Sequence, residues 1–136
     1  MRYLFDTTFI IDLVAGDEGA AKKAVEIDSK ASYVAISAVT AQEYLRGVYY
    51  LYLDSQDLVK KLEEARKDLS RFEIIPFDFE IAEVAARIDA KLARLGTSIG
   101  YADVIVAATA ISRDLILVTR NVKHFSKIPE IRVESY

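Results

Sequence analysis

The sequence predicts an α/β fold in which a mostly parallel central sheet is flanked by helices on both faces. Short apolar segments typical of buried strands alternate with longer segments whose apolar residues recur at helical spacing. The segment 115–119 is apolar on both of its faces, as the strands of parallel sheets are. The 136 residues contain no repeat, linker or low-complexity tract. We therefore expect one domain that spans residues 1–136.

The first half of the chain begins with the short buried segment 3–5 and ends with the clearest helical pattern, at 55–72. In that helix Leu58, Leu62 and Leu69 share one face, because they recur at steps of four and seven. The helix at 39–53 contains several tyrosines and has no breaker except Gly47. In order, the expected elements are a strand at 3–5, helices at 8–14 and 20–30, a strand at 33–36, and helices at 39–53 and 55–72.

The second half is marked by residues typical of the ends of elements. Pro76 indicates the end of a strand or an edge strand, because proline cannot donate to a sheet. Asp78 is a suitable N-cap and Gly96 a suitable C-cap for the helix between them. In order, the expected elements are a strand at 73–77, helices at 79–95 and 102–112, a strand at 115–119, a helical turn at 122–127 and a strand at 132–134.

Composition excludes several classes of chemistry. The chain has no cysteine, which excludes disulfides, thiolate nucleophiles and cysteine-bound metals. His124 is the only histidine, so a metal site would be built mainly from oxygen ligands. The net charge of −3 is not that of a strongly basic nucleic-acid binder. No apolar run is long enough to span a bilayer, and the apolar start is too short for a signal peptide, so we expect a cytoplasmic protein without a membrane partner.

Three carboxylates stand next to apolar segments. Asp6 lies between two apolar runs, Glu43 follows the segment 36–40, and Asp103 directly precedes the apolar segment 104–108. In a parallel sheet ligands gather at the carboxyl ends of the strands, and these acids are expected near that edge. Carboxylates grouped there repel one another unless they are protonated or bridged by a cation, and a hard divalent cation takes oxygen ligands.

Each acid also has a local explanation. Asp6 is suited to cap the helix that starts near Thr8. The pattern Thr40-x-x-Glu43 fits a capping box, and Asp103 lies in a first helical turn, where negative charge is favourable. The functional hypothesis therefore depends on the three acids as a set.

Four segments in this order resemble the motifs of the PIN-domain nucleases, and within them the VapC-type toxins of toxin–antitoxin pairs. The resemblance covers essentially the whole chain. The segment 4–13 is similar to a first motif, in which a hydroxyl residue stands two positions after an aspartate. The segment 36–47 is similar to a second motif, with a glutamate four residues before a glycine. The segments 99–110 and 117–125 are similar to the third and fourth motifs.

The resemblance implies the family's three-layer fold and a set of site residues. Asp6, Glu43 and Asp103 would be the acidic metal-site residues, with the hydroxyl of Thr8 in support. Thr119 and Asn121 would line the same pocket. Many members carry an aspartate where Asn121 stands, which leaves open whether one metal ion or two are bound. Tyr101 also occupies a place where relatives often carry an acid.

The implied activity is endoribonucleolytic hydrolysis of RNA phosphodiester bonds with Mg²⁺ or Mn²⁺. The metal would lower the pKa of a bound water and neutralise charge on the phosphate. Glu43 would either bind metal or orient the attacking water, and the sequence leaves both roles open. The implied partners are RNA, a cognate antitoxin protein and a second copy of the chain in a homodimer.

Basic residues near the fourth motif are candidates for RNA phosphate contacts. Arg120, Lys123, His124 and Lys127 fall at i, i+3, i+4 and i+7, so they would share a face if the stretch were helical. A solvated basic face explains the same pattern equally well. Arg46 is a further candidate.

Two other classes of function deserve comparison. A catalytically silent PIN-like module that only binds a partner would fit the neutral Asn121 and the negative net charge. A phosphoacceptor receiver domain would need adjacent acids after the first strand and a lysine after the last core strand. Asp6-Thr7 and Arg120 do not supply these residues.

Overall fold

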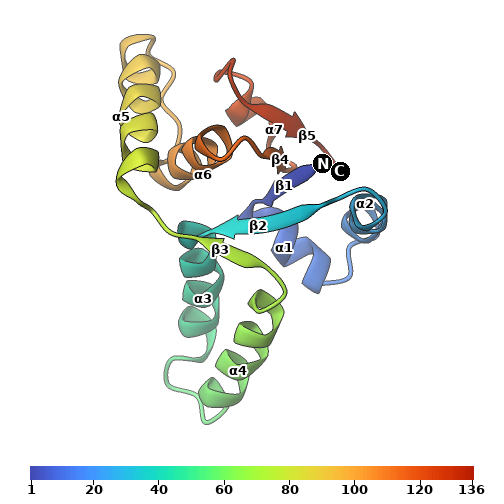
Figure 1. The fold of residues 1–136 in the computed structure, drawn as a ribbon. Coiled ribbons are helices and arrows are strands. Elements are labelled where there is room, and N and C mark those ends of the chain that lie inside the picture. The colour runs from blue at the N-terminus through green and yellow to red at the C-terminus, as the bar shows by residue number, and fades with distance from the viewer.

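The computed structural model describes residues 1–136, which form five strands and seven helices in alternation (Figure 1). The strands are β1 (Arg2–Phe5), β2 (Tyr33–Ser37), β3 (Glu73–Ile75), β4 (Ile116–Val118) and β5 (Arg132–Glu134). The helices are α1 (Thr7–Val14), α2 (Glu18–Asp28), α3 (Ala38–Tyr52), α4 (Leu58–Leu69), α5 (Phe79–Arg94), α6 (Tyr101–Ser112) and α7 (Val122–Phe125). None of these helices combines the length and the apolar character that a membrane span requires.

The five strands form one sheet in the order β3-β2-β1-β4-β5, and every pairing is parallel. The prediction of a mostly parallel sheet is therefore confirmed. β1 is the central strand, and Leu4 lies in register with Ala35 of β2 and Leu117 of β4. Because all strands run in one direction, their carboxyl ends meet at one edge.

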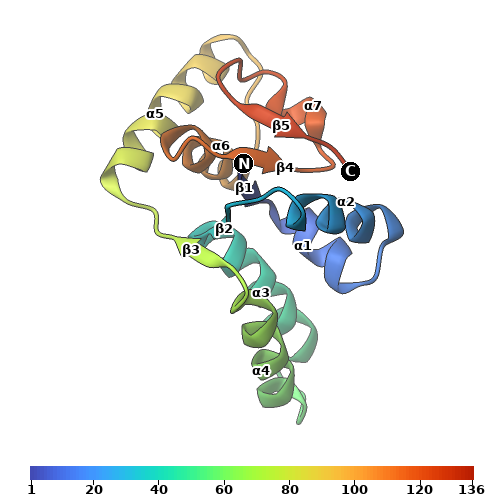
Figure 2. The same cartoon turned by 45° about the vertical axis from the view of Figure 1, so that its right-hand side comes forward.

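Successive side chains of the strands point to opposite faces of the sheet, and each face carries its own hydrophobic core. On one face Leu4 and Leu117 pack against α5, α6 and α7. On the other face Tyr3 and Phe5 pack against α1, α2 and the end of α4. Both views place α5 and α6 on the opposite side of the sheet from α1 and α2 (Figures 1 and 2). Helices on both faces were expected from the apolar strands.

α3 and α4 form a hairpin that extends away from the sheet (Figure 2). The Tyr44 hydroxyl donates to Asp68 across the hairpin at 2.9 Å. Burial, together with this hydrogen bond, raises the pKa of Tyr44 to about 12. Tyr49 and Tyr50 are instead exposed. Packing within the hairpin thus explains the presence of Tyr44 but not that of Tyr49 and Tyr50.

The bounds of several elements differ from the expected ones for local reasons. β3 is an edge strand that stops at Ile75, because the next residue is Pro76. α2 begins at Glu18, because Asp17 caps it by accepting a hydrogen bond from the Ala20 amide at 2.9 Å. α5 ends at Arg94, one residue before the predicted end, so Leu95 lies beyond the helix and is exposed.

The caps expected for α5 are confirmed. The Asp78 carboxylate accepts a hydrogen bond from the Ile81 amide at 3.0 Å. Gly96 follows the C-cap residue Leu95 with φ +69°, a left-handed conformation that favours glycine.

Ser37 fixes the start of α3, the helix that carries Glu43. Its buried hydroxyl accepts a hydrogen bond from the Thr40 amide at 3.1 Å and lies 3.2 Å from the Thr40 hydroxyl. We expect Ser37→Ala to lower the free energy of unfolding by about 1 kcal/mol, because the cap and a buried partner are lost. Urea denaturation checks this value.

Ser29→Ala is the matched control, because the Ser29 hydroxyl makes one exposed hydrogen bond to the Glu26 carbonyl. Its effect should stay within about 0.5 kcal/mol. Equal stability of Ser37→Ala and wild type would contradict the assigned cap.

Candidate active site

Asp6 follows the central strand β1 and is the N-cap of α1. One carboxylate oxygen, Oδ1, accepts a hydrogen bond from the Phe9 amide at 2.8 Å. The other, Oδ2, accepts a short hydrogen bond from the Thr119 hydroxyl. The expected capping role is therefore confirmed. Each oxygen keeps a further lone pair, so capping does not exclude a ligand.

Asp6 is also the buried acid of the set, with only 6% of its surface exposed. Burial raises the pKa of Asp6, and the charges of Asp103 and Asp12 act in the same direction. The hydrogen bonds from Thr119 and Phe9 oppose this shift without reversing it. No lysine or arginine forms an ion pair with Asp6. The carboxylate therefore lies in an environment where a cation would be favourable.

Glu43 does not share this environment, because it is exposed on α3. It accepts a hydrogen bond from the Thr7 hydroxyl at 2.6 Å. The capping-box hypothesis is wrong, since Ser37 is the cap and takes the Thr40 amide. Although it follows the apolar segment 36–40, Glu43 is therefore in contact with solvent.

The hydroxyl beside Glu43 belongs to Thr7, a residue that the sequence motif did not single out. Thr8, which the motif favoured, makes no comparable contact to Glu43. Thr7 Oγ1 also lies 3.4 Å from Thr40 Oγ1, which joins α1 to α3 at this edge. The only sequence signal for Thr7 was its position next to Asp6.

Asp103 lies in the first turn of α6 and is half-buried. Its Oδ2 lies 3.1 Å from Nδ1 of His124, which belongs to α7. The favourable placement at a helix N-terminus is confirmed. In addition to this interaction with its own helix, Asp103 contacts His124, which lies 21 positions later in the sequence.

Thr119 and Asn121 follow β4 at the same edge. Thr119 is fully buried, donates to Asp6 and accepts a hydrogen bond from the Asn121 amide at 3.0 Å. Asn121 is exposed and precedes α7 without capping it through its side chain. Its carboxamide is therefore available to a ligand.

The basic residues do not form the predicted helical face. α7 covers only Val122–Phe125, so Arg120 and Lys127 lie outside it. Arg120 pairs instead with Asp17 at 3.1 Å and Asp12 at 3.5 Å. Lys123 and His124 remain exposed, and His124 contacts Asp103.

Arg46 lies elsewhere, on the α3–α4 hairpin. Its guanidinium carbon is 5.9 Å from the centre of the Tyr50 ring. It lies one turn after Glu43 on α3, and its contact with RNA stays a prediction.

The acids do not form a ready-made metal cage. No group of three or more His, Cys, Asp or Glu side chains is placed to hold a metal ion. The expectation that all three carboxylates meet around one cation is therefore corrected. The donors themselves fit Mg²⁺ or Mn²⁺, because Asp6 and Asp103 are hard oxygen ligands that influence each other electrostatically. Mg²⁺ usually takes one or two carboxylates and completes its shell with waters and substrate phosphates.

The fold and this edge of the sheet match a known family. A profile of the PIN domain matches residues 3–131. The chain therefore belongs to the PIN-domain family.

Its relatives within the family are VapC-type ribonucleases. The tRNA(fMet)-specific endonuclease VapC of Salmonella typhimurium is 28% identical over 136 residues, which span 100% of this chain and 98% of the relative. Ribonuclease VapC1 of Rickettsia felis is 32% identical over 133 residues, or 98% of this chain and 95% of the relative. The fold is similar to the crystal structure of VapBC2 from Rickettsia felis bound to a promoter DNA fragment. The TM-score is 0.86 at 25% identity, over 100% of this chain and 99% of that chain.

The raised pKa of Asp6 predicts the stability of Asp6→Asn without metal. Below the unfolded-state value of 3.8, Asp6 is protonated in both states and costs the fold nothing. Between 3.8 and the higher folded-state pKa, wild type loses stability as pH rises, because the unfolded state releases the proton first, whereas asparagine has no proton to release and keeps an oxygen for the Phe9 amide. We expect the stability advantage of Asp6→Asn to grow with pH and then level off, measured by thermal unfolding in EDTA from about pH 4 to 8. An advantage that shrinks as pH rises would contradict the assigned environment.

Proposed function

We propose that this protein is a metal-dependent endoribonuclease, the toxin of a toxin–antitoxin pair, and that Asp6 and Asp103 bind its Mg²⁺ or Mn²⁺. The observation that carries the proposal is the buried Asp6 carboxylate, which has Asp103 nearby and no basic partner. A divalent ion supplies the missing positive charge. Membership of a family with ribonuclease relatives supports the same activity.

The roles of the side chains follow from their contacts. The bound ion would supply an activated water and neutralise charge on the scissile phosphate. Thr119 holds Asp6 in orientation through its hydroxyl, and Asn121 offers a neutral oxygen at the same edge. Glu43, exposed and held by Thr7, is suited to orient the attacking water or to take up its proton.

RNA would approach over the exposed residues of this edge. Lys123 and His124 supply donors to phosphate oxygens, and His124 at the same time contacts Asp103. Arg120 pairs with Asp12 and Asp17, and these ion pairs compete with a contact to phosphate. Binding is therefore expected to rely on the metal and on few direct cationic contacts.

Substitution of the two aspartates tests the proposal. Asp6→Asn and Asp103→Asn should each lower the rate of RNA cleavage by at least about 100-fold, because each removes a charge that holds the metal. The measurement is cleavage of purified tRNA(fMet) and of an unstructured RNA in Mn²⁺, with circular dichroism to verify folding. Asp54→Asn, in the exposed loop of the hairpin, is the matched control and should cleave as wild type does. If Asp6→Asn cleaves RNA at the wild-type rate, the proposal is wrong.

A silent partner-binding module is the second candidate, favoured by the neutral Asn121 and the absence of a three-acid cage. Calorimetric titration with Mn²⁺ separates the two. The nuclease should release heat that is lost in Asp103→Asn, whereas a silent module should give no heat that depends on Asp103.

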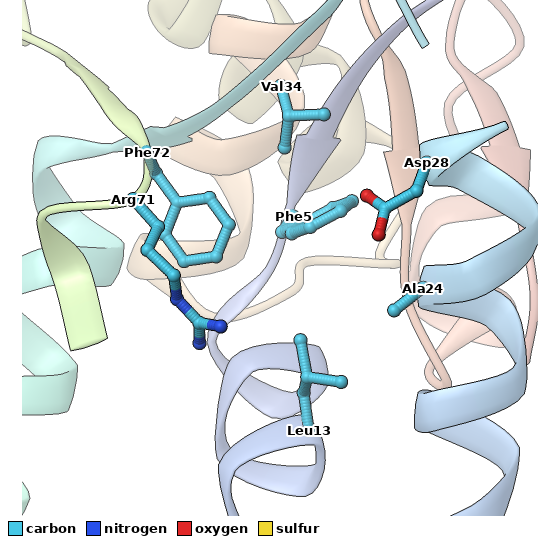
Figure 3. Close-up of a pocket in the computed structure, with 7 residues that line it drawn as sticks. All are labelled: Phe5, Leu13, Ala24, Asp28, Val34, Arg71 and Phe72. Atoms are coloured by element: carbon cyan, nitrogen blue, oxygen red, sulfur yellow. The ribbon is translucent and has the colours of Figure 1, made fainter. Parts of the chain in front are cut away.

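A groove on the face of the sheet that α1 and α2 cover supports binding of an antitoxin. It is a pocket of about 450 Å³ between α1, α2 and the start of β3, with Phe5, Leu13 and Phe72 among its apolar lining. Asp28 and Arg71 lie on opposite sides of Phe5 (Figure 3). Neither forms an ion pair within the chain. The chemistry fits an apolar segment with a basic residue opposite Asp28 and an acidic residue opposite Arg71.

Charge reversal tests this assignment. Arg71→Glu should weaken binding of the antitoxin encoded by a flanking reading frame by at least about 10-fold, because it places like charges together. RNA cleavage by the free protein should be unchanged, since Arg71 contacts the Asp68 carbonyl and the Phe72 ring and none of Asp6, Glu43 and Asp103. Arg94→Glu, on the exposed end of α5, is the matched control. Titration of the two purified proteins measures the affinity, and unchanged binding by Arg71→Glu would contradict the groove.

A further inference from the structure

Tyr136, two residues past β5, joins two segments that are distant in the sequence. Its hydroxyl donates to Asp12 Oδ2 at 2.7 Å. Its ring packs edge-on against the Phe9 ring of α1, with centroids 4.7 Å apart. The Arg120 guanidinium lies over the same ring at 4.8 Å. One side chain thus contacts α1 through two residues and the segment after β4 through a third.

The residues that Tyr136 contacts include or adjoin both hydrogen-bond donors of Asp6. The amide of Phe9 donates to Asp6 Oδ1. Arg120 directly follows Thr119, whose hydroxyl donates to Asp6 Oδ2. A shift of α1 relative to this segment would therefore break one donor contact or the other.

The tyrosine also binds Asp12, an acid whose charge reaches Asp6. Asp12 lies close enough to Asp6 to raise its pKa. The Tyr136 hydroxyl and Arg120 both bind the Asp12 carboxylate. Burial and the hydrogen bond to Asp12 raise the pKa of Tyr136, so the phenol remains a donor at neutral pH.

We infer that Tyr136 is a positioning residue for Asp6: its ring holds α1 against the segment after β4, so that Phe9 and Thr119 both reach the carboxylate. The inference rests on the proposed role of Asp6 in metal binding. Tyr136 touches neither metal nor substrate. Its effect reaches the reaction through the orientation of Asp6 alone.

The test compares three variants. Tyr136→Ala removes the ring, and Tyr136→Phe keeps it while losing the bond to Asp12. Leu62→Ala, in the hairpin helix α4, removes a buried side chain that lies away from Asp6 and serves as the control for general destabilisation. The primary readout is the Mn²⁺ dissociation constant from calorimetry, and the second is kcat for RNA cleavage.

Tyr136→Ala should weaken Mn²⁺ binding and lower kcat by about 10-fold or more, as loss of residues that orient metal ligands usually does. Tyr136→Phe should recover most of both, and Leu62→Ala should match wild type below its unfolding temperature. A Tyr136→Ala variant that behaves like Leu62→Ala overturns the inference, and so does a Tyr136→Phe variant as impaired as Tyr136→Ala.

A measurement on the metal-free protein separates the inference from the proposed function. In EDTA at neutral pH, the change in unfolding temperature caused by Asp6→Asn should be smaller in Tyr136→Ala than in wild type, because a loosened Asp6 regains solvent. Equal changes in the two backgrounds overturn the inference. Failure of the proposed function would show differently, as RNA cleavage that persists in Asp6→Asn itself.

Discussion

The structure depends on the burial of one carboxylate at the end of its central strand. Removing Asp6 from water costs free energy, and the chain returns only part of it through two hydrogen bonds. Neither donor carries a charge, and the nearest charged influences on Asp6 are other acids. If this position served only to cap α1, the fold would be more stable with a neutral cap residue there, or with a basic side chain beside Asp6. The arrangement is costly for the fold and suited to holding a cation.

This constraint explains why the all-parallel sheet matters. β1 and β4 are neighbours, so their carboxyl ends bring Asp6 and Thr119 together across 113 positions of the sequence. α6 runs back across the sheet, and its first turn therefore returns Asp103 to the same edge. The two apolar cores, one on each face, supply the stability against which the buried charge is tolerated. Each aspartate is positioned by its own helix, but Asp6 and Asp103 lie near each other only because of the sheet topology.

The extent to which the sequence predicts the fold follows from how local each signal is. Apolar spacing located the helices, and Asp78 with Gly96 marked the ends of α5, because caps and periodicity act within a few residues. The exposure of Glu43 was missed, although α3 starts within one residue of the predicted position. Exposure depends on how the helix packs against segments that are distant in the sequence, and a local pattern of apolar residues does not fix this packing.

Contacts between distant segments were the least predictable part of the site. Arg120 has the spacing of a phosphate-binding residue, but two aspartates from the start of the chain bind it first. The contact of Thr7 with Glu43, made across 36 positions of the sequence, was likewise not predicted. Tyr136 gave no signal, since its contacts lie more than 100 positions away, at Asp12 and Phe9. The sequence thus indicated which residue types belong to the site, but not which charged side chains form ion pairs with one another.

The groove and the acidic edge are adjacent in the sequence, but the backbone between them is held rigidly by the sheet. Phe5 lines the groove and directly precedes Asp6, and its ring packs against Phe9 and Phe72 at 4.6 and 5.5 Å. However, β1 is paired on both sides, so its backbone cannot shift without breaking ladders to β2 and β4. An occupant of the groove therefore has no inexpensive way to displace Asp6 through Phe5.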